Sequence, residues 1–259
     1  MASVFHPNQP AFLGKFPLGR AQLNYDHPIA MGIYQAFIVE GGVLRDLHTQ
    51  RSTRKLILNS PIIAGLKGHV AQYDFASGES SGQIIDNYVY NAEPGWSTLC
   101  VLKPIISMQG QSSSNAVTVS SSMYFQYEKA VPTWSIGGIH TTDSRLTADS
   151  LWHNVVIIDD TISGGPGDTQ EAWIDGQSIG TTSINRFGSQ NFIFGSNSTV
   201  SSNRQWGGDI KLVFRWKRPL SPAEANELSL NPYSPNGIPL ILDSSIPDLI
   251  FSGIAPTPS

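Results

Sequence analysis

The fold is decided by the stretch Glu171–Ile179, which reads EAWIDGQSI. Asp175-Gly176 stands between two short strand-like runs, EAWI and QSI. Both central residues of a type I′ turn need positive φ, so Asp-Gly in this setting is the strongest short-range signal for a β-hairpin. The stretch therefore predicts two antiparallel strands joined by a tight turn.

Short apolar runs separated by turn residues continue this pattern on both sides of the hairpin. They predict further strands at residues 33–39, 71–75, 97–102, 117–127, 154–158, 192–194 and 210–216. Many short strands without alternating helices are typical of a sandwich or barrel. The last strand is predicted to have one buried face and one wet face, with the apolar set Ile210, Leu212, Phe214 and Trp216 opposite the basic set Lys211, Arg215 and Lys217.

One helix is predicted after the last strand. Ser221 is a favourable N-cap, Pro222 suits the first helical position, and Glu224 completes a capping box, so the helix should run to about Leu230. The Pro- and Gly-rich ends predict an extended arm over 1–28 and an extended tail over 234–259. The domain between them is predicted to cover 29–233.

The composition favours a β-protein with a hydroxyl- and amide-rich surface. Of the 259 residues, 40% are hydrophobic and only 14% are charged, against about 25% charged in typical soluble domains. The net charge is −4, and no basic block could follow a phosphate backbone, so no nucleic-acid partner is predicted. The first ten residues do not read as a secretory signal, and no run reaches the ~20 apolar residues of a membrane span.

Five motifs together resemble the laminin-G-like, concanavalin A-like jelly-roll family. They are LWHNV (151–155), AWIDG (172–176), FIFG (192–195), GDIKLVF (208–214) and RPLSPAE (218–224). The resemblance implies an all-β, two-sheet antiparallel jelly-roll sandwich with one short C-terminal helix. Three further motifs resemble structural proteins of tailed bacteriophages and prophages that carry this fold: PLG (17–19), HPIAMGI (27–33) and the closing LS…E…L…NPY (220–233).

These resemblances favour a non-catalytic virion structural protein, either a capsid decoration or a tail-associated subunit. This hypothesis predicts a homo-oligomer that is made in the host cytoplasm without a signal peptide and located in the virion. Its terminal arms would dock on other virion proteins, and host surface glycans would be a further partner. The alternative is a carbohydrate-binding or adhesion module, and a glycan hydrolase is the third hypothesis.

Nothing in the sequence favours an enzyme. A retaining glycosidase needs two carboxylates about 5 Å apart in one cleft, whereas the adjacent Asp159 and Asp160 would point to opposite faces of a strand. No Gly-x-Ser-x-Gly elbow is present. His153 is interpreted as a structural strand residue, and Cys100, inside an apolar run, as a small buried hydrophobe.

Sugar binding requires exposed aromatic rings beside hydroxyls and amides. Trp206, next to two glycines, is the first candidate for an exposed platform, followed by Trp134 and Tyr90. The other four tryptophans fit strand positions and are predicted to lie in the core, namely Trp96, Trp152, Trp173 and Trp216.

The resemblance also implies calcium as a candidate metal at the rim of the sandwich. The candidate ligands are Asp46, Asp159, Asp160 and Asp168. The alternative interpretation of these residues is a set of solvated acidic loops. No other cofactor is predicted.

Overall fold

A computed structural model of the chain describes residues 21–40, 43–48, 51–52, 62–65, 68–73, 83–88, 95–105, 113–118, 124–128, 133–136, 139–141, 151–160, 169–183, 190–194, 206–238 and 240–243. The elements follow one another along the chain as β1 (Ala21–Leu23), η2 (Pro28–Ala30), β2 (Ile33–Glu40), β3 (Val43–Asp46), β4 (Arg51–Ser52), β5 (Ile62–Gly65), β6 (Gly68–Tyr73), β7 (Gln83–Tyr88), β8 (Trp96–Pro104), β9 (Ser113–Thr118), β10 (Tyr124–Glu128), β11 (Thr133–Ile136), β12 (Ile139–Thr141), β13 (His153–Asp160), β14 (Thr169–Ile174), β15 (Gln177–Ser183), β16 (Gln190–Phe194), β17 (Gly208–Trp216), α1 (Pro222–Leu230), η4 (Pro235–Gly237) and β18 (Ile241–Asp243).

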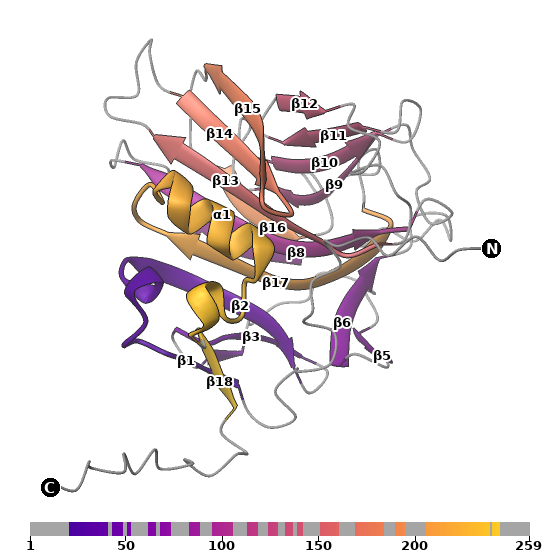
Figure 1. Cartoon of the computed structure of the whole chain (residues 1–259). Helices are drawn as coiled ribbons and strands as arrows, with labels where there is room; N and C mark the ends of the chain where they lie inside the picture. The colour runs from indigo at the N-terminus through magenta and orange to yellow at the C-terminus, as the bar shows by residue number, and fades with distance from the viewer. Residues whose placement is uncertain are drawn as a thin grey trace, which may run out of the picture.

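Most strands form two stacked antiparallel sheets, which confirms the predicted jelly-roll sandwich, and β1 and β18 form a separate two-stranded sheet. The larger sheet has the order β15-β14-β13-β8-β17-β2-β3-β4, with β6 also paired to β17 and β5 paired to β6. The smaller sheet has the order β12-β11-β10-β9-β16-β7 and lies behind the larger one in Figure 1. No helix in the described part of the chain is long and apolar enough to span a membrane.

The larger sheet has two different faces. Its outer face contacts α1, and the Asn154 side chain on this face donates to the backbone oxygen of Ser229 in the helix, at 3.0 Å. Its inner face meets the smaller sheet, because β12 contacts β15 and Ile139 lies against Gly180. The main apolar core lies on the outer face, where side chains of β2, β8, β13 and β17 pack with α1 and with β1 and β18.

The prediction of a wet face on the last strand is wrong. Every residue of β17 is buried, including Arg215 at 0% exposed and Lys211 at 3%. The reason is that β17 lies in the middle of the larger sheet, between β8 and β2, and is covered on both faces. Lys217, just beyond the strand, is exposed as predicted.

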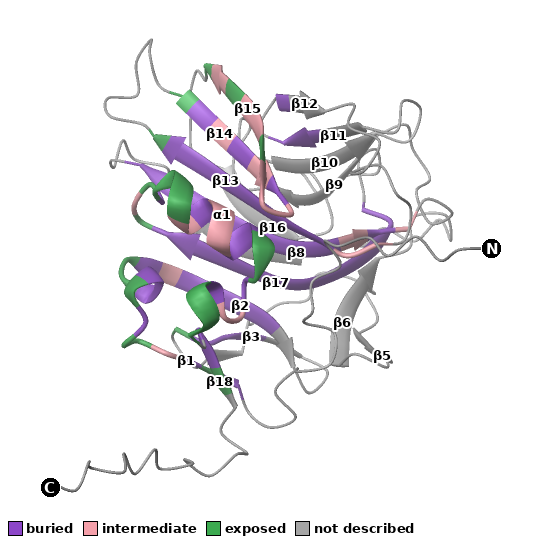
Figure 2. Ribbon diagram, in the orientation of Figure 1, coloured by how far each residue is buried: buried purple, intermediate pink, exposed green. Residues whose placement is uncertain are grey.

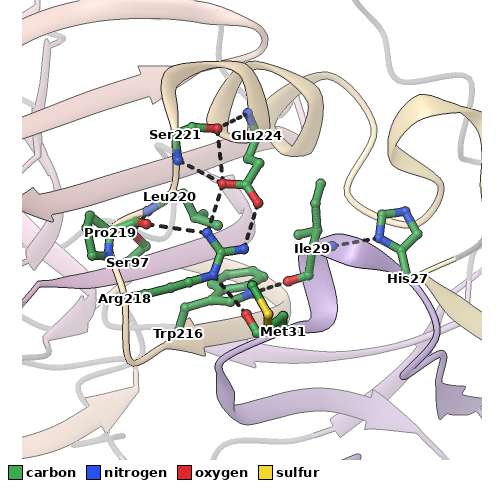
Figure 3. Close-up of polar contacts among 10 residues, drawn as sticks. All are labelled: His27, Ile29, Met31, Ser97, Trp216, Arg218, Pro219, Leu220, Ser221 and Glu224. Carbon is green, nitrogen blue, oxygen red and sulfur yellow. Dashed lines mark hydrogen bonds and ion pairs between the residues drawn. The ribbon is translucent and has the colours of Figure 1, made fainter.

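The predicted helix is confirmed together with its cap. In α1 the Ser221 side chain accepts a hydrogen bond from the backbone N–H of Glu224, and the Glu224 carboxylate accepts one from the backbone N–H of Ser221. The same carboxylate holds Arg218 through two contacts, of 2.6 and 2.8 Å, and Arg218 Nε donates to the Met31 oxygen (Figure 3). This network joins the start of α1 to the segment that precedes β2.

Part of each predicted arm belongs to the folded domain. β1 and β18 pair with each other in antiparallel register, with Ala21 opposite Asp243 and Leu23 opposite Ile241. Ala21, Leu23 and Ile241 are buried in the main core. The boundaries predicted at residues 28 and 234 therefore exclude two core strands, whereas residues 1–20 and 244–259 lie outside the described residues.

Replacing Glu224 tests how much the capping network stabilises the domain. The hydrogen bond from Arg218 is the main cause that lowers the pKa of Glu224 from its ordinary value of 4.5. A lowered pKa means that the ionised carboxylate stabilises the fold above pH 4.5, and that this stabilisation is lost as the pH falls through the lowered pKa. Glu224→Gln should cost about 1 kcal/mol of unfolding free energy at pH 7, measured by thermal unfolding across pH.

The difference between the wild type and Glu224→Gln should shrink below pH 4.5, where Glu224 of the unfolded chain becomes protonated, and vanish below the lowered pKa of the folded state. Asp160→Asn, which removes a carboxylate from the exposed end of β13, serves as the control and should leave the unfolding temperature at pH 7 nearly unchanged. A difference that stays constant from pH 7 to pH 2 would contradict this role of the carboxylate.

Candidate functional site

The β14–β15 hairpin is fixed in place by its turn and by the helix beside it. Asp175 and Gly176 have φ values of 48° and 81°, which confirms the turn predicted from Asp-Gly. The Gly176 N–H donates to Ser229 Oγ at 3.0 Å, and the Asn226 side chain donates to the Gly176 oxygen at 2.7 Å. The helix therefore holds the turn, and with it the two strands.

The side chains of this hairpin alternate between the inner and the outer face of the larger sheet. On β14, Gln170, Ala172 and Ile174 are fully buried toward the smaller sheet. The outward side chains of both strands are exposed or half-buried, as the green and pink segments of β14 and β15 show in Figure 2. We call these residues the outer strip: Thr169, Glu171 and Trp173 on β14, with Ser183, Thr181 and Ser178 opposite them on β15.

The outer strip joins an aromatic ring to hydroxyls and one carboxylate. Trp173 packs one side against the main core and is half-buried. Ser178 Oγ donates to Glu171 Oε1 at 3.1 Å. Among the described residues, none accepts a hydrogen bond from the buried Trp173 Nε1–H. From Thr169 to Trp173 the strip is about 14 Å long, since each strand residue advances about 3.4 Å.

A second polar surface surrounds Tyr25, which follows β1. Tyr25 is 59% exposed, and its hydroxyl lies 3.4 Å from His48 Nδ1 and donates to the His48 oxygen. Burial and the charge of Asp46 both raise the pKa of Tyr25. Among the large hydrophobic side chains that are exposed in the described part of the chain, Tyr25 is the aromatic one. Its described neighbours are His48 and Asp46, and they form no row of hydroxyls like that of the outer strip.

The inner face of the larger sheet carries a buried cation beside aromatic rings. Arg215 is 0% exposed; it donates to Gln35 Oε1 at 2.7 Å, and its guanidinium lies 5.0 Å from the centre of the Trp96 ring. The ammonium group of Lys217 lies 4.4 Å from the centre of the Tyr34 ring. Because Arg215 and Trp96 are closed off from solvent, this cluster acts in packing rather than in ligand contact.

His153 has the structural role that the sequence predicts. It is 2% exposed, and its Nδ1 lies 2.7 Å from Asp175 Oδ2, while Asp175 Oδ1 accepts the Asn154 N–H at 2.9 Å. The pair resembles the histidine and aspartate of a Ser-His-Asp triad. The serine near this turn, Ser229, does not bond to His153 in the described contacts of its hydroxyl. Ser229 Oγ donates to the Asn226 oxygen and belongs to the helix on the other face of the sheet.

The structure rules out the first of the predicted sugar-stacking residues. Trp206 is 0% exposed, so the prediction of an exposed platform is wrong, because a buried ring offers no face to a ligand. Trp134 lies within strand β11, and Tyr90 lies outside the described residues. Of the four tryptophans predicted to be core, Trp96 and Trp216 are buried, but Trp152 and Trp173 are only half-buried.

The three described residues among the four predicted calcium ligands do not form one site. Asp46 is 6% exposed, and its Oδ1 accepts the backbone N–H groups of Ala36 and His48, both at 3.0 Å. Asp159 is buried and Asp160 exposed, on opposite faces of β13 as predicted, and three strands separate β13 from β3. Asp168 lies outside the described residues. Within the described residues, no three His, Cys, Asp or Glu side chains gather as a metal site.

Cys100 is a core residue on β8, as predicted. It is 0% exposed, and burial raises the pKa of its thiol well above the ordinary value. A thiol with a raised pKa is mostly protonated at neutral pH, which excludes it as a ready nucleophile.

Sequence reasoning missed Trp173 as a surface residue. The signal was present in the strand itself, because Trp173 is two residues from Glu171 and two-residue spacing places both on one face. A tryptophan on the same face as a glutamate and next to a helix is half-covered rather than enclosed.

Several solved structures are similar in fold to this chain. The binding domain of Paraclostridial Mosquitocidal Protein 1 superposes with a TM-score of 0.56 at 16% identity, over 76% of this chain and 51% of that chain. A mutant sialidase of Trypanosoma rangeli that displays trans-sialidase activity gives 0.50 at 14% identity, over 78% and 33%. Domain 4 of AbnA, an extracellular GH43 arabinanase of Geobacillus stearothermophilus solved with arabinotriose, gives 0.50 at 11%, over 76% and 98%.

These likenesses show a shared β-sandwich fold. This chain spans about half of the mosquitocidal domain and a third of the sialidase, but nearly all of the arabinanase domain. None of the three is described as a virion protein, so the bacteriophage assignment stays a prediction. No protein-family model and no curated protein matches the sequence.

Two substitutions of Asp175 separate its roles at the turn. Asp175→Ala removes the acceptors for His153 and Asn154 and places a residue with a Cβ but no polar group at positive φ, so the unfolding free energy should fall by roughly 2–4 kcal/mol. Asp175→Asn keeps an oxygen for the Asn154 N–H and tolerates positive φ, and should cost about 1 kcal/mol. Urea unfolding at pH 7 measures both, and equal losses would contradict this assignment.

Proposed function

We propose that this chain is a non-catalytic carbohydrate-binding module that holds a glycan along the outer strip. The observation that carries the proposal is the half-buried Trp173 ring in line with Glu171, Ser178 and Thr181 on one accessible sheet face. Its position is fixed by the turn and by α1. A rigid element is a better support for a binding site than a loop.

The chemistry of the strip matches that of a sugar ring. A sugar presents an apolar C–H face rimmed by hydroxyls, and a tryptophan offers a large flat apolar surface with a polar N–H at its edge. The Glu171 carboxylate is a strong acceptor for sugar hydroxyls, and serine and threonine hydroxyls both donate and accept.

The fold likeness gives this proposal independent support. The arabinanase domain that superposes over 98% of its length was solved with a bound arabinotriose. At 11% identity the likeness concerns the fold alone, so the strip and not the neighbour identifies the candidate residues.

We propose a non-catalytic module because the carboxylates on this face are accessible to solvent. Glu171 and Asp160 point to the outer face on neighbouring strands, where both remain accessible to solvent. Glycoside hydrolysis needs a carboxylic acid kept protonated by burial and a partner carboxylate across a cleft. An open sheet face supplies neither the burial nor the enclosure.

Binding to soluble polysaccharides tests the proposal. The probe panel is linear arabinan, arabinoxylan, galactan and a sialylated glycan, measured by affinity gel electrophoresis and then by calorimetry on the polysaccharide that retards the protein most. Trp173→Ala and Glu171→Ala should each weaken binding about tenfold or more, which corresponds to about 1.4 kcal/mol. Tyr25→Ala, which removes an exposed ring elsewhere, is the matched control and should bind like the wild type.

Glu171→Ala keeps the test independent of folding, because Trp173→Ala also removes packing from the core. Circular dichroism and the unfolding temperature check both variants. Wild-type affinity in both folded variants, or no retardation by any polysaccharide in the panel, would overturn the proposal. Release of reducing sugars from a bound polysaccharide would overturn its non-catalytic part.

A further inference from the structure

β15 is a terminal strand of the larger sheet. It pairs with β14 on one side, and no described strand pairs with its other side. Its seven residues span roughly 20 Å, at about 3.4 Å per step. None of them is fully buried. The free side of such a strand presents backbone N–H and C=O groups that another strand can pair with.

The terminal strands of the larger sheet differ in how they are protected. Proteins usually guard an edge by making it short or charged, or by placing proline there. The other terminal strands of this sheet are short: β4 has two residues and includes Arg51, and β5, which pairs with β6, has four. β15 reads QSIGTTS and contains no charged residue and no proline. Of the three terminal strands, β15 is the one that is long, uncharged and free of proline, which points to a pairing edge.

A bulge limits which part of β15 can pair. The register with β14 shifts beside Ile179, and Gly180 has a φ of 126°. Bulges kink an edge and disfavour regular pairing at that point. From Gly180 to Ser183 the register is regular, because Gly180, Thr181, Thr182 and Ser183 lie opposite consecutive residues of β14. This second half of the strand is the segment that suits a partner.

We propose that β15 pairs with β15 of a second copy of this chain, in antiparallel orientation about a two-fold axis. Two identical edges are self-complementary under a two-fold rotation. Opposed residues must share a face, so either Thr181 or Thr182 lies on the axis. Threonine and serine hydroxyls opposite each other form favourable cross-strand pairs.

Charge does not oppose pairing with a second copy. The nearest charged side chain on the outer face of the hairpin is Glu171, one strand in from the edge. In the paired sheet the two Glu171 side chains lie three strand spacings apart, about 14 Å. This exceeds the Debye length of about 8 Å at physiological salt. Their repulsion is therefore largely screened.

The pairing also extends the binding surface, and this consequence rests on the proposed function. The outer strip lies on β14 and β15, so β15–β15 pairing places two strips side by side across the axis. One long or branched glycan could then contact both, and the joint affinity would exceed that of one strip through a raised effective concentration.

Sedimentation velocity without glycan tests the interface. The wild type at 5–300 μM should show a monomer–dimer equilibrium. Thr181→Lys places two ammonium groups near the axis and should raise the dimer dissociation constant tenfold or more. Thr169→Lys puts the same charge on the same face one strand inward, and should leave that constant within twofold. Unfolding temperatures confirm that both variants fold.

A cysteine trap gives a second, independent measurement. Cys100 is the sole cysteine and is buried, so Thr181→Cys or Thr182→Cys introduces the reactive thiol. Oxidation should give a disulfide-linked dimer with one of these two variants. A monomeric wild type at 300 μM, or equal dissociation constants for Thr181→Lys and the wild type, would overturn the inference.

The two proposals fail separately. A monomer that still binds polysaccharide through Trp173 and Glu171 would remove the dimer and keep the binding function. A dimer that binds no polysaccharide in the panel would do the reverse.

Discussion

The left-handed backbone at Asp175 and Gly176 fixes the end of the larger sheet that β14 and β15 form. The two residues reverse the chain tightly enough for β14 and β15 to pair from the turn onward. The Asp175 carboxylate ties the turn to His153 and Asn154 on β13, and Ser229 and Asn226 tie it to α1. The direction of Trp173 and the position of the free edge of β15 both follow from this anchored turn.

Local signals in the sequence were enough for the elements that define the fold. The Asp-Gly hairpin and the Ser221–Glu224 capping box were predicted and confirmed, because turn chemistry and capping act within a few residues. The wet face predicted for β17 was wrong, because alternation within a strand does not reveal that both faces are covered. Neighbouring strands decide that, and strand order is a property of the whole chain.

In the candidate site, too, local signals could be predicted from the sequence, whereas contacts between distant segments could not. Alternation could have placed Trp173 beside Glu171, but the cross-strand partners Ser178 and Thr181 depend on the bulge at Ile179, which shifts the register by one residue. Trp206 precedes two glycines, a setting that suggests a loop, yet it is fully buried. Exposure depends on contacts with distant segments, and these are not visible in a short stretch of sequence.

The pairing of β1 with β18 sets where the domain connects to the rest of its chain. Ala21 and Asp243 are opposed in the register, so the first and last described strands of the domain lie side by side. Such a domain behaves as a cassette. It can be inserted into a surface loop of a carrier protein without spreading the loop apart, and its two ends can be joined by a short linker for circular permutation.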